Sequence, residues 1–263
     1  MKSINGYIEV DGIINKVTSV DDLKQVVQSL GKDFTELNEA EFKKLTSKYV
    51  YQRDDKTCFG DDCRVMYKDK HLIRSFANDL GEYKIINGTL VVQDNACYTA
   101  LKTRVYIYNI KSIIFPSSLI AIGDRAFGCN EVNDIYFSDS IQYIGLSAFS
   151  KCNCIKGKLV LPKELRFLET SAFRYCSGIS SVVFSDKIEV IGSHVFAQCT
   201  SLKSVYIPNS VKLVGSGVFD DCFALESIYI PKGSKEKFSE FFPLLTDKLV
   251  ETETDETDEF SKI

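Results

Sequence analysis

The sequence contains five consecutive copies of one short unit, each marked by a phenylalanine with a cysteine two or three residues later. The marking residues are Phe127, Phe149, Phe173, Phe196 and Phe219, at spacings of 22, 24, 23 and 23 residues. A unit of this length cannot enclose a hydrophobic core, so it buries its apolar side chains only by stacking on further copies. The repeat therefore predicts a solenoid in which each unit forms one coil.

Each unit contains a short run of alternating residues, such as IKSIIFP and LKSVYIP. Alternate residues of a strand point to the same side, so one set in each run faces the core. The inward pairs are Ile113/Phe115, Ile135/Phe137, Leu159/Leu161, Val182/Phe184, Val205/Ile207 and Ile228/Ile230. Stacking then places the strands side by side in a parallel sheet on the concave side of the solenoid.

The other set of residues forms a row that we expect to be exposed on this concave sheet. Its members are Ile114, Tyr136, Val160, Val183, Tyr206 and Tyr229. An exposed aromatic and aliphatic strip is typical of an interaction surface, and the concave face of a solenoid is a common recognition surface. The alternative is that strands favour Tyr, Val and Ile anywhere, in which case the row only stabilises the sheet.

The stretch IPNSVKLVGSGVFDDCFALESIYIPKGS resembles the BspA-type leucine-rich repeat, and the likeness extends over roughly residues 90–231. The resemblance implies an α/β fold, namely a right-handed leucine-rich-repeat solenoid with a parallel concave sheet. The motif residues of that family are structural, so the resemblance implies no active site. It also implies a role in binding proteins or matrix, as in bacteria and some protists, where such proteins are often found on the cell surface.

Further positions recur in each unit, and we expect them to be structural. The repeat cysteines are Cys129, Cys152, Cys176, Cys199 and Cys222. We expect small buried thiols there, although disulfides between adjacent coils are also sterically allowed. Four units share a glycine four residues before the phenylalanine, which we expect to permit a tight turn. His194 lies two residues before Phe196, in a column of varied residues, so we expect it to face solvent, away from Cys199.

We divide the chain into four parts. Residues 1–80 are expected to form a small α+β N-terminal domain, and residues 81–231 a solenoid of about five full repeats plus an incomplete first unit. Residues 232–250 are expected to form a C-terminal helical cap, and residues 251–263 an acidic disordered tail.

Local signals support these parts. Asp11–Gly12 lies between two alternating runs and predicts a hairpin, and RVMYKDKHLIRSF predicts a second one. Capping patterns predict helices that begin at Ser19 and Asn38. In the cap, Ser234 is the expected N-cap of a helix with apolar residues on one face, which Pro243 ends or kinks.

Composition and motifs argue against several functional classes. The net charge is −4, which does not provide a basic face for nucleic acid, and no apolar run is long enough to insert into a membrane. The sequence contains no phosphate-binding loop and no hydrolase or zinc-protease motif. Cys58 and Cys63 with His71 nearby lack a fourth ligand, so we expect free thiols or a disulfide rather than a metal, and no cofactor.

The first residues contain no signal peptide, which predicts a cytoplasmic protein if Met1 is the natural start, and otherwise one that is secreted or on the cell surface. The leading hypothesis is a non-enzymatic interaction module that binds a protein or peptide through the concave row. The alternatives are an extracellular adhesin or surface antigen of the same fold, or a small N-terminal enzyme or metal module that the solenoid targets. The identity of the partner and the oligomeric state are not predicted.

Overall fold

The computed structural model describes residues 6–10, 13–17, 58–59, 65–68, 71–75, 79–97, 109–129 and 131–253. The chain divides into two compact units, Met1–Cys58 and Phe59–Ile263. In the first unit, β1 (Gly6–Val10) and β2 (Ile13–Val17) pair antiparallel, which confirms the hairpin predicted around Asp11–Gly12. The helices predicted to begin at Ser19 and Asn38 lie outside the described residues.

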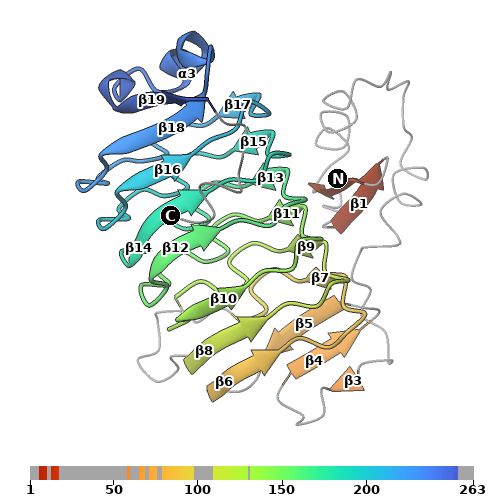
Figure 1. Cartoon of the computed structure of the whole chain (residues 1–263). Coiled ribbons are helices and arrows are strands. Elements are labelled where there is room, and N and C mark those ends of the chain that lie inside the picture. The colour runs from red at the N-terminus through yellow and green to blue at the C-terminus, as the bar shows by residue number, and fades with distance from the viewer. Residues whose placement is uncertain are drawn as a thin grey trace, which may run out of the picture. The chain divides into compact units, whose positions relative to one another are not determined.

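The second unit contains a solenoid whose strands stack in two layers (Figure 1). One layer is a nine-stranded sheet, which we call the short-strand sheet. In spatial order its strands are β17 (Leu213–Val214), β15 (Val190–Ile191), β13 (Phe167–Leu168), β11 (Tyr143–Ile144), β9 (Ala121–Ile122), β7 (Val91–Val92), β5 (His71–Ser75), β4 (Val65–Lys68) and β3 (Cys58–Phe59). Strands β4 and β5 form the second predicted hairpin, and β5 pairs parallel with β7, so this hairpin continues the sheet.

The other layer, the long-strand face, corresponds to the predicted concave sheet and consists of two parallel sheets. The first contains β6 (Asp79–Lys84), β8 (Asn109–Ile114) and β10 (Asp134–Tyr136). The second contains β12 (Gly157–Val160), β14 (Ile179–Val183), β16 (Ser204–Tyr206), β18 (Ser227–Pro231) and β19 (Leu249–Thr252). A single sheet was the expectation. The break between β10 and β12 falls at the unit with one extra residue, where the register shifts between Gly157 and Lys158.

The core of the solenoid is a ladder of stacked phenylalanine rings, one from each coil. Ring centroids are 5.4 Å apart for Phe127–Phe149, 5.2 Å for Phe149–Phe173, 5.5 Å for Phe173–Phe196 and 6.3 Å for Phe196–Phe219. The predicted inward strand residues are buried around this ladder, except that Ile135 and Phe137 are only partly buried. The parallel stacked-coil architecture is thus confirmed, and its right-handedness stays a prediction.

The turn around each phenylalanine, which we call the arc, is built from left-handed backbone, in most coils at residues other than glycine. The residues two before and two after the phenylalanine have positive φ, for example His194 at 56° and Gln198 at 63°. The expected role of the glycine column was wrong. Gly192 does not have a positive φ, but a Cβ there would lie 2.4 Å from the backbone N of Thr170 in the preceding coil. The glycine is needed because two coils approach closely.

The C-terminal cap contains α3 (Lys235–Phe241) and the 3-10 helix η1 (Thr246–Lys248). Phe238 is the buried residue of α3. Ser234 occupies the N-cap position, but its hydroxyl donates to the carbonyl of Pro231 instead of capping the helix. Strand β19 was not predicted, and Glu251, expected in a disordered tail, pairs with Ile230. Strand β19 adds one further strand to the long-strand face, and its Leu249 is buried. The remaining tail lies outside the described residues.

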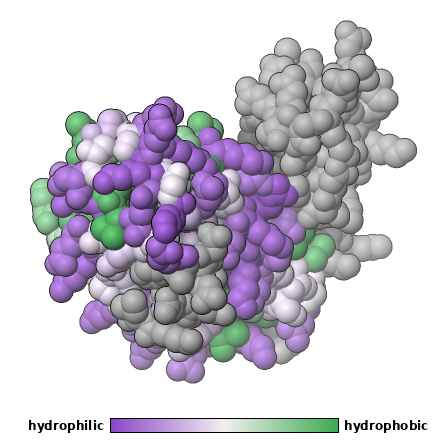
Figure 2. Space-filling view, turned by 45° about the horizontal axis from the view of Figure 1, so that its top comes forward, coloured by the Kyte–Doolittle hydropathy of each residue, from purple (hydrophilic) through white to green (hydrophobic). Residues whose placement is uncertain are grey.

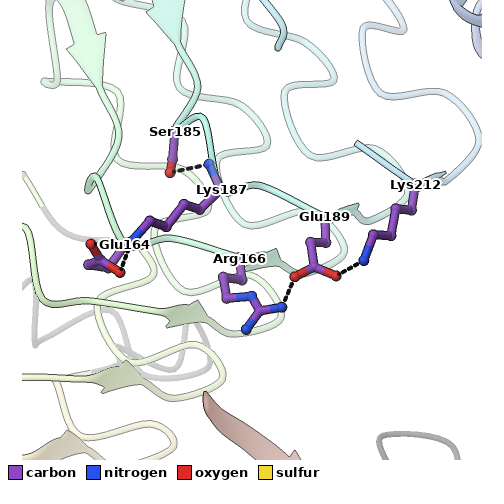
Figure 3. A network of polar contacts seen from close by, with 6 residues as sticks. All are labelled: Glu164, Arg166, Ser185, Lys187, Glu189 and Lys212. Atoms are coloured by element: carbon purple, nitrogen blue, oxygen red, sulfur yellow. Dashed lines mark hydrogen bonds and ion pairs between the residues drawn. The ribbon is translucent and has the colours of Figure 1, made fainter. Parts of the chain in front are cut away.

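Charged side chains join successive coils along one edge of the solenoid (Figure 3). The carboxylate of Glu189 accepts a hydrogen bond from Arg166 of the preceding coil and another, at 2.7 Å, from Lys212 of the following coil. Glu164 and Lys187 form a second, more exposed pair at 2.6 Å. Glu189 and Arg166 are largely buried, whereas the Lys212 end of this bridge across three coils is exposed to solvent.

Candidate binding surface

The long-strand face aligns the predicted row of outward residues strand by strand. Tyr136 pairs in register with Ile114, and Tyr206 pairs with both Val183 and Tyr229. Val160 pairs with Val183 at the edge strand of the second sheet. The structure therefore brings the row together within each sheet, with the sheet break between Tyr136 and Val160.

The row is not uniformly exposed, which corrects the prediction. The exposed fractions are 42% for Ile114, 60% for Tyr136 and 49% for Val160, but only 5% for Val183 and 2% for Tyr206. Tyr229 is intermediate. Val183 and Tyr206 are in-register neighbours on β14 and β16, whereas Ile114 stays exposed although β8 is also an inner strand. The accessible part of the row is therefore Ile114, Tyr136 and Val160.

Polar residues border the accessible part. Lys84 pairs in register with Ile114 and is exposed, so it extends the row by one strand. In the neighbouring row, the exposed carboxylates of Glu82 and Asp134 lie in register on either side of Ser112. The alternation in GEYKII could have revealed Lys84, because it continues the strand pattern of the repeats into the incomplete first unit.

This arrangement places apolar and aromatic side chains beside charged ones on the long-strand face. An apolar and aromatic centre with a charged rim is the usual anatomy of a protein–protein interface. On the second sheet, Lys158 pairs in register with Ser181, and desolvation by burial lowers the pKa of the Lys158 ammonium group. Within the described ranges, no three His, Cys, Asp or Glu side chains are placed to hold a metal ion.

The repeat cysteines are part of the packing between coils. The thiol of Cys199 donates to the carbonyl of Phe173 one coil earlier, at 3.3 Å, and Cys152, Cys176 and Cys222 make the equivalent contact. Burial raises the pKa of the Cys222 thiol to about 11, and it raises that of Cys199 as well, so these thiols are poor nucleophiles. Cys129 was wrongly placed in this column, since its coil lacks one residue and its side chain is half-exposed.

His194 and Cys199 do not form a common site, as expected. Cys199 is buried, whereas His194 is partly exposed with its Nε2 3.6 Å from Asp220 Oδ2 of the next coil. The other possible metal site cannot be placed in the same way, because Cys63 and the side chains of Cys58 and His71 lie outside the described residues.

Among the described residues, no helix has the length and apolar character needed to cross a membrane.

The repeat pattern matches a profile of the BspA type leucine rich repeat region over residues 104–180 and 167–247. These matches cover more than half of the chain and coincide with the stacked coils. The chain belongs to the BspA-type leucine-rich repeat family. Proteins of this family and fold are generally not enzymes. A comparison with curated protein sequences gave no match.

Solved structures with a similar fold are bacterial leucine-rich repeat proteins. The pneumococcal vaccine antigen PcpA is 19% identical with a TM-score of 0.52, over 70% of this chain and 52% of PcpA. A leucine rich cell surface protein of Faecalibacterium prausnitzii is 24% identical with a TM-score of 0.47, over 71% of this chain and 42% of that protein. A leucine rich repeat protein of Treponema pallidum is 20% identical with a TM-score of 0.46, over 71% and 92%.

The PcpA comparison supports the fold, and at this identity it supports nothing finer. The chain spans about half of PcpA and less than half of the Faecalibacterium protein.

Proposed function

We propose that this protein is a non-enzymatic interaction module that binds a protein or peptide on the long-strand face. The observation that carries the proposal is the exposure of Ile114, Tyr136 and Val160 on a sheet surface. Large side chains left in water on one face of a sheet favour a partner that covers them, and tyrosine provides contact area at low entropic cost.

The charges around these residues define the partner further. Lys84 at one end favours an acidic group on the partner, and the carboxylates of Glu82 and Asp134 along one side favour basic groups. Such rim charges set orientation and association rate more than affinity, so the binding energy would come from Ile114, Tyr136 and Val160.

The test is capture of a partner from the native host by the full chain, compared between variants. Ile114→Ser with Tyr136→Ser removes the apolar centre, while Leu213→Ser removes an equally exposed apolar side chain from the short-strand sheet and serves as the matched control. We expect the double variant to lose a partner that both the wild type and the control retain. The same partner bound equally by all three proteins would refute the proposal, provided that circular dichroism shows all three to be folded.

We also propose that the protein is displayed on the cell surface, where the same binding surface would act as that of an adhesin or surface antigen. The support is membership of the BspA-type family, whose homologues are bacterial cell-surface proteins. Labelling of intact host cells with a membrane-impermeant amine reagent tests this proposal. Labelling of this protein without labelling of a cytosolic marker is the expected result, and exclusive recovery in the cytosolic fraction would contradict it.

A further inference from the structure

The arcs of neighbouring coils are joined by a regular set of backbone hydrogen bonds, all with the same polarity. In one interior coil, the N–H groups of Ser171, Phe173 and Tyr175 donate to carbonyls of the next coil at 2.8, 3.0 and 2.9 Å. The N–H groups of His194, Phe196 and Gln198 do the same one coil later. Each arc thus presents donors toward the C-terminal end of the solenoid.

The last arc has no following coil. The equivalent N–H groups of Gly217, Phe219 and Asp221 donate to no acceptor among the described residues. Strand β17, the outermost strand of the short-strand sheet, also has open backbone groups. The carbonyls of Lys212 and Val214 accept no hydrogen bond from any described residue. In the preceding coil, the equivalent carbonyls of Glu189 and Ile191 are both occupied.

The cap completes the other parts of the solenoid but leaves this arc open. Strand β19 continues the long-strand face, and the ring of Phe242 continues the aromatic ladder at 5.6 Å from Phe219. Between the arc and the segment after α3 lies a pocket of about 680 Å³, lined by residues 214–223 and 240–245. This volume is in the range of pockets that bind small ligands or side chains.

The pocket has an apolar wall and an acidic rim. Phe241, Phe242 and Leu245 line it, and Leu244 and Phe223 at its edge are 91% and 83% exposed. Figure 2, in which the α3 end of the chain comes forward, shows apolar side chains in separate patches within a mostly polar surface. Asp220, Asp221 and Glu240 also line the pocket, and no lysine or arginine does.

We propose that this open arc binds a non-acidic peptide segment of a partner protein, which takes up the arc conformation and stacks on the arc as one further coil. Its main-chain carbonyls would accept from Gly217, Phe219 and Asp221, and an apolar side chain would enter the pocket. A basic side chain would face Asp221, as Gln198 Nε2 does from the preceding coil at 3.1 Å. The carboxylates disfavour an anion or the acidic segment of residues 251–259 in this place. The site is independent of the long-strand face.

The probe is a labelled peptide that copies residues 190–200 with Cys199→Ser, because this segment already presents its carbonyls to an arc of the same kind. We expect it to bind the full chain and to slow amide exchange in residues 215–223. Leu244→Ser should weaken binding about 5-fold through lost apolar contact, while Val160→Ser on the long-strand face should leave it unchanged. The peptide change Gln198→Lys should strengthen binding and Gln198→Glu should weaken it, and Asp221→Asn should reduce both effects.

Three results would overturn the proposal. The first is no binding at millimolar peptide, and the second is binding without slower exchange in residues 215–223. The third is a dimer of the chain in sedimentation that protects the same residues without peptide, because the occupant would then be a second copy. If only Val160→Ser weakens binding, the peptide occupies the long-strand face, so failure of this proposal is distinguishable from failure of the proposed function.

Discussion

Removal of one ring from the middle of the phenylalanine ladder tests whether stacking between coils stabilises the protein. Phe173 is fully buried, and its ring centroid lies 5.2 Å from that of Phe149, 5.5 Å from that of Phe196 and 6.5 Å from that of Phe137, which packs edge-on. Truncation of a buried phenylalanine to alanine costs about 3–5 kcal/mol. Each lost aromatic pair accounts for about 0.5–1.5 kcal/mol beyond area burial. With two stacked pairs lost, we expect Phe173→Ala to cost about 4–5 kcal/mol.

The matched control is Phe223→Ala, which removes the same side chain from a site where it is almost fully exposed. That change should alter the free energy of unfolding by less than about 0.5 kcal/mol. Urea denaturation followed by circular dichroism and tyrosine fluorescence measures both, since the chain has 13 tyrosines and no tryptophan. A loss below about 1 kcal/mol for Phe173→Ala would refute the account of the core, because no buried aromatic stack would give so small a value.

Three further changes test the contacts between coils. Gly192→Ala should lower the free energy of unfolding by about 1–3 kcal/mol in urea, because the new Cβ meets the backbone of Thr170, and an unchanged value would contradict the close approach. Glu189→Gln should cost about 1–2 kcal/mol in low salt and less in high salt, whereas the exposed Glu164→Gln should cost at most about 0.5 kcal/mol. Stability should also fall at alkaline pH, because burial raises the pKa of Cys222 from 9.0 to about 11. The unfolded state releases this proton above pH 9 and the folded state keeps it, so stability is complete below pH 9 and declines up to about pH 11. A pH titration of urea unfolding should therefore show a shallower alkaline decline for Cys222→Ala than for the wild type, and identical slopes would contradict the assignment.

The stacking of coils could be predicted from the sequence because one packing requirement recurs five times. The phenylalanine column, the inward strand residues and the hairpin around Asp11–Gly12 are all local patterns whose meaning does not depend on distant contacts. The C-terminal helix was predictable in part, because Phe238 and Phe241 lie on α3, whereas Phe242 is its C-cap and Leu245 follows it.

Features that depend on how closely neighbouring coils approach, or on the backbone conformation of the arcs, could not be predicted from local patterns. The residues with positive φ in the arcs include arginine, serine, lysine and tyrosine, none of which indicates a left-handed backbone in a sequence. The role of Gly192 depends on its distance from Thr170, which lies in another coil. In the sequence, β19 contains only two apolar residues, Leu249 and Val250, within a polar segment. It forms a strand because it pairs with β18, the last repeat strand of the sheet.

The candidate surface was predictable as a row but not in its exposure. Alternation correctly gave the side of the sheet on which Tyr136 and Tyr206 lie, yet it could not give how much of each ring remains accessible. That depends on what packs around each side chain, and only Ile114, Tyr136 and Val160 remain as the accessible part of the predicted row.

The central functional claim is that a partner covers the accessible part of the long-strand face. Hydrogen–deuterium exchange of the full chain, with and without the captured partner, tests it most directly. We predict that the partner slows exchange in peptides that contain residues 109–114, 134–136 and 157–160, and leaves the short-strand sheet unchanged. Protection confined to the short-strand sheet or to the cap, with these three strands unaffected, would contradict the claim.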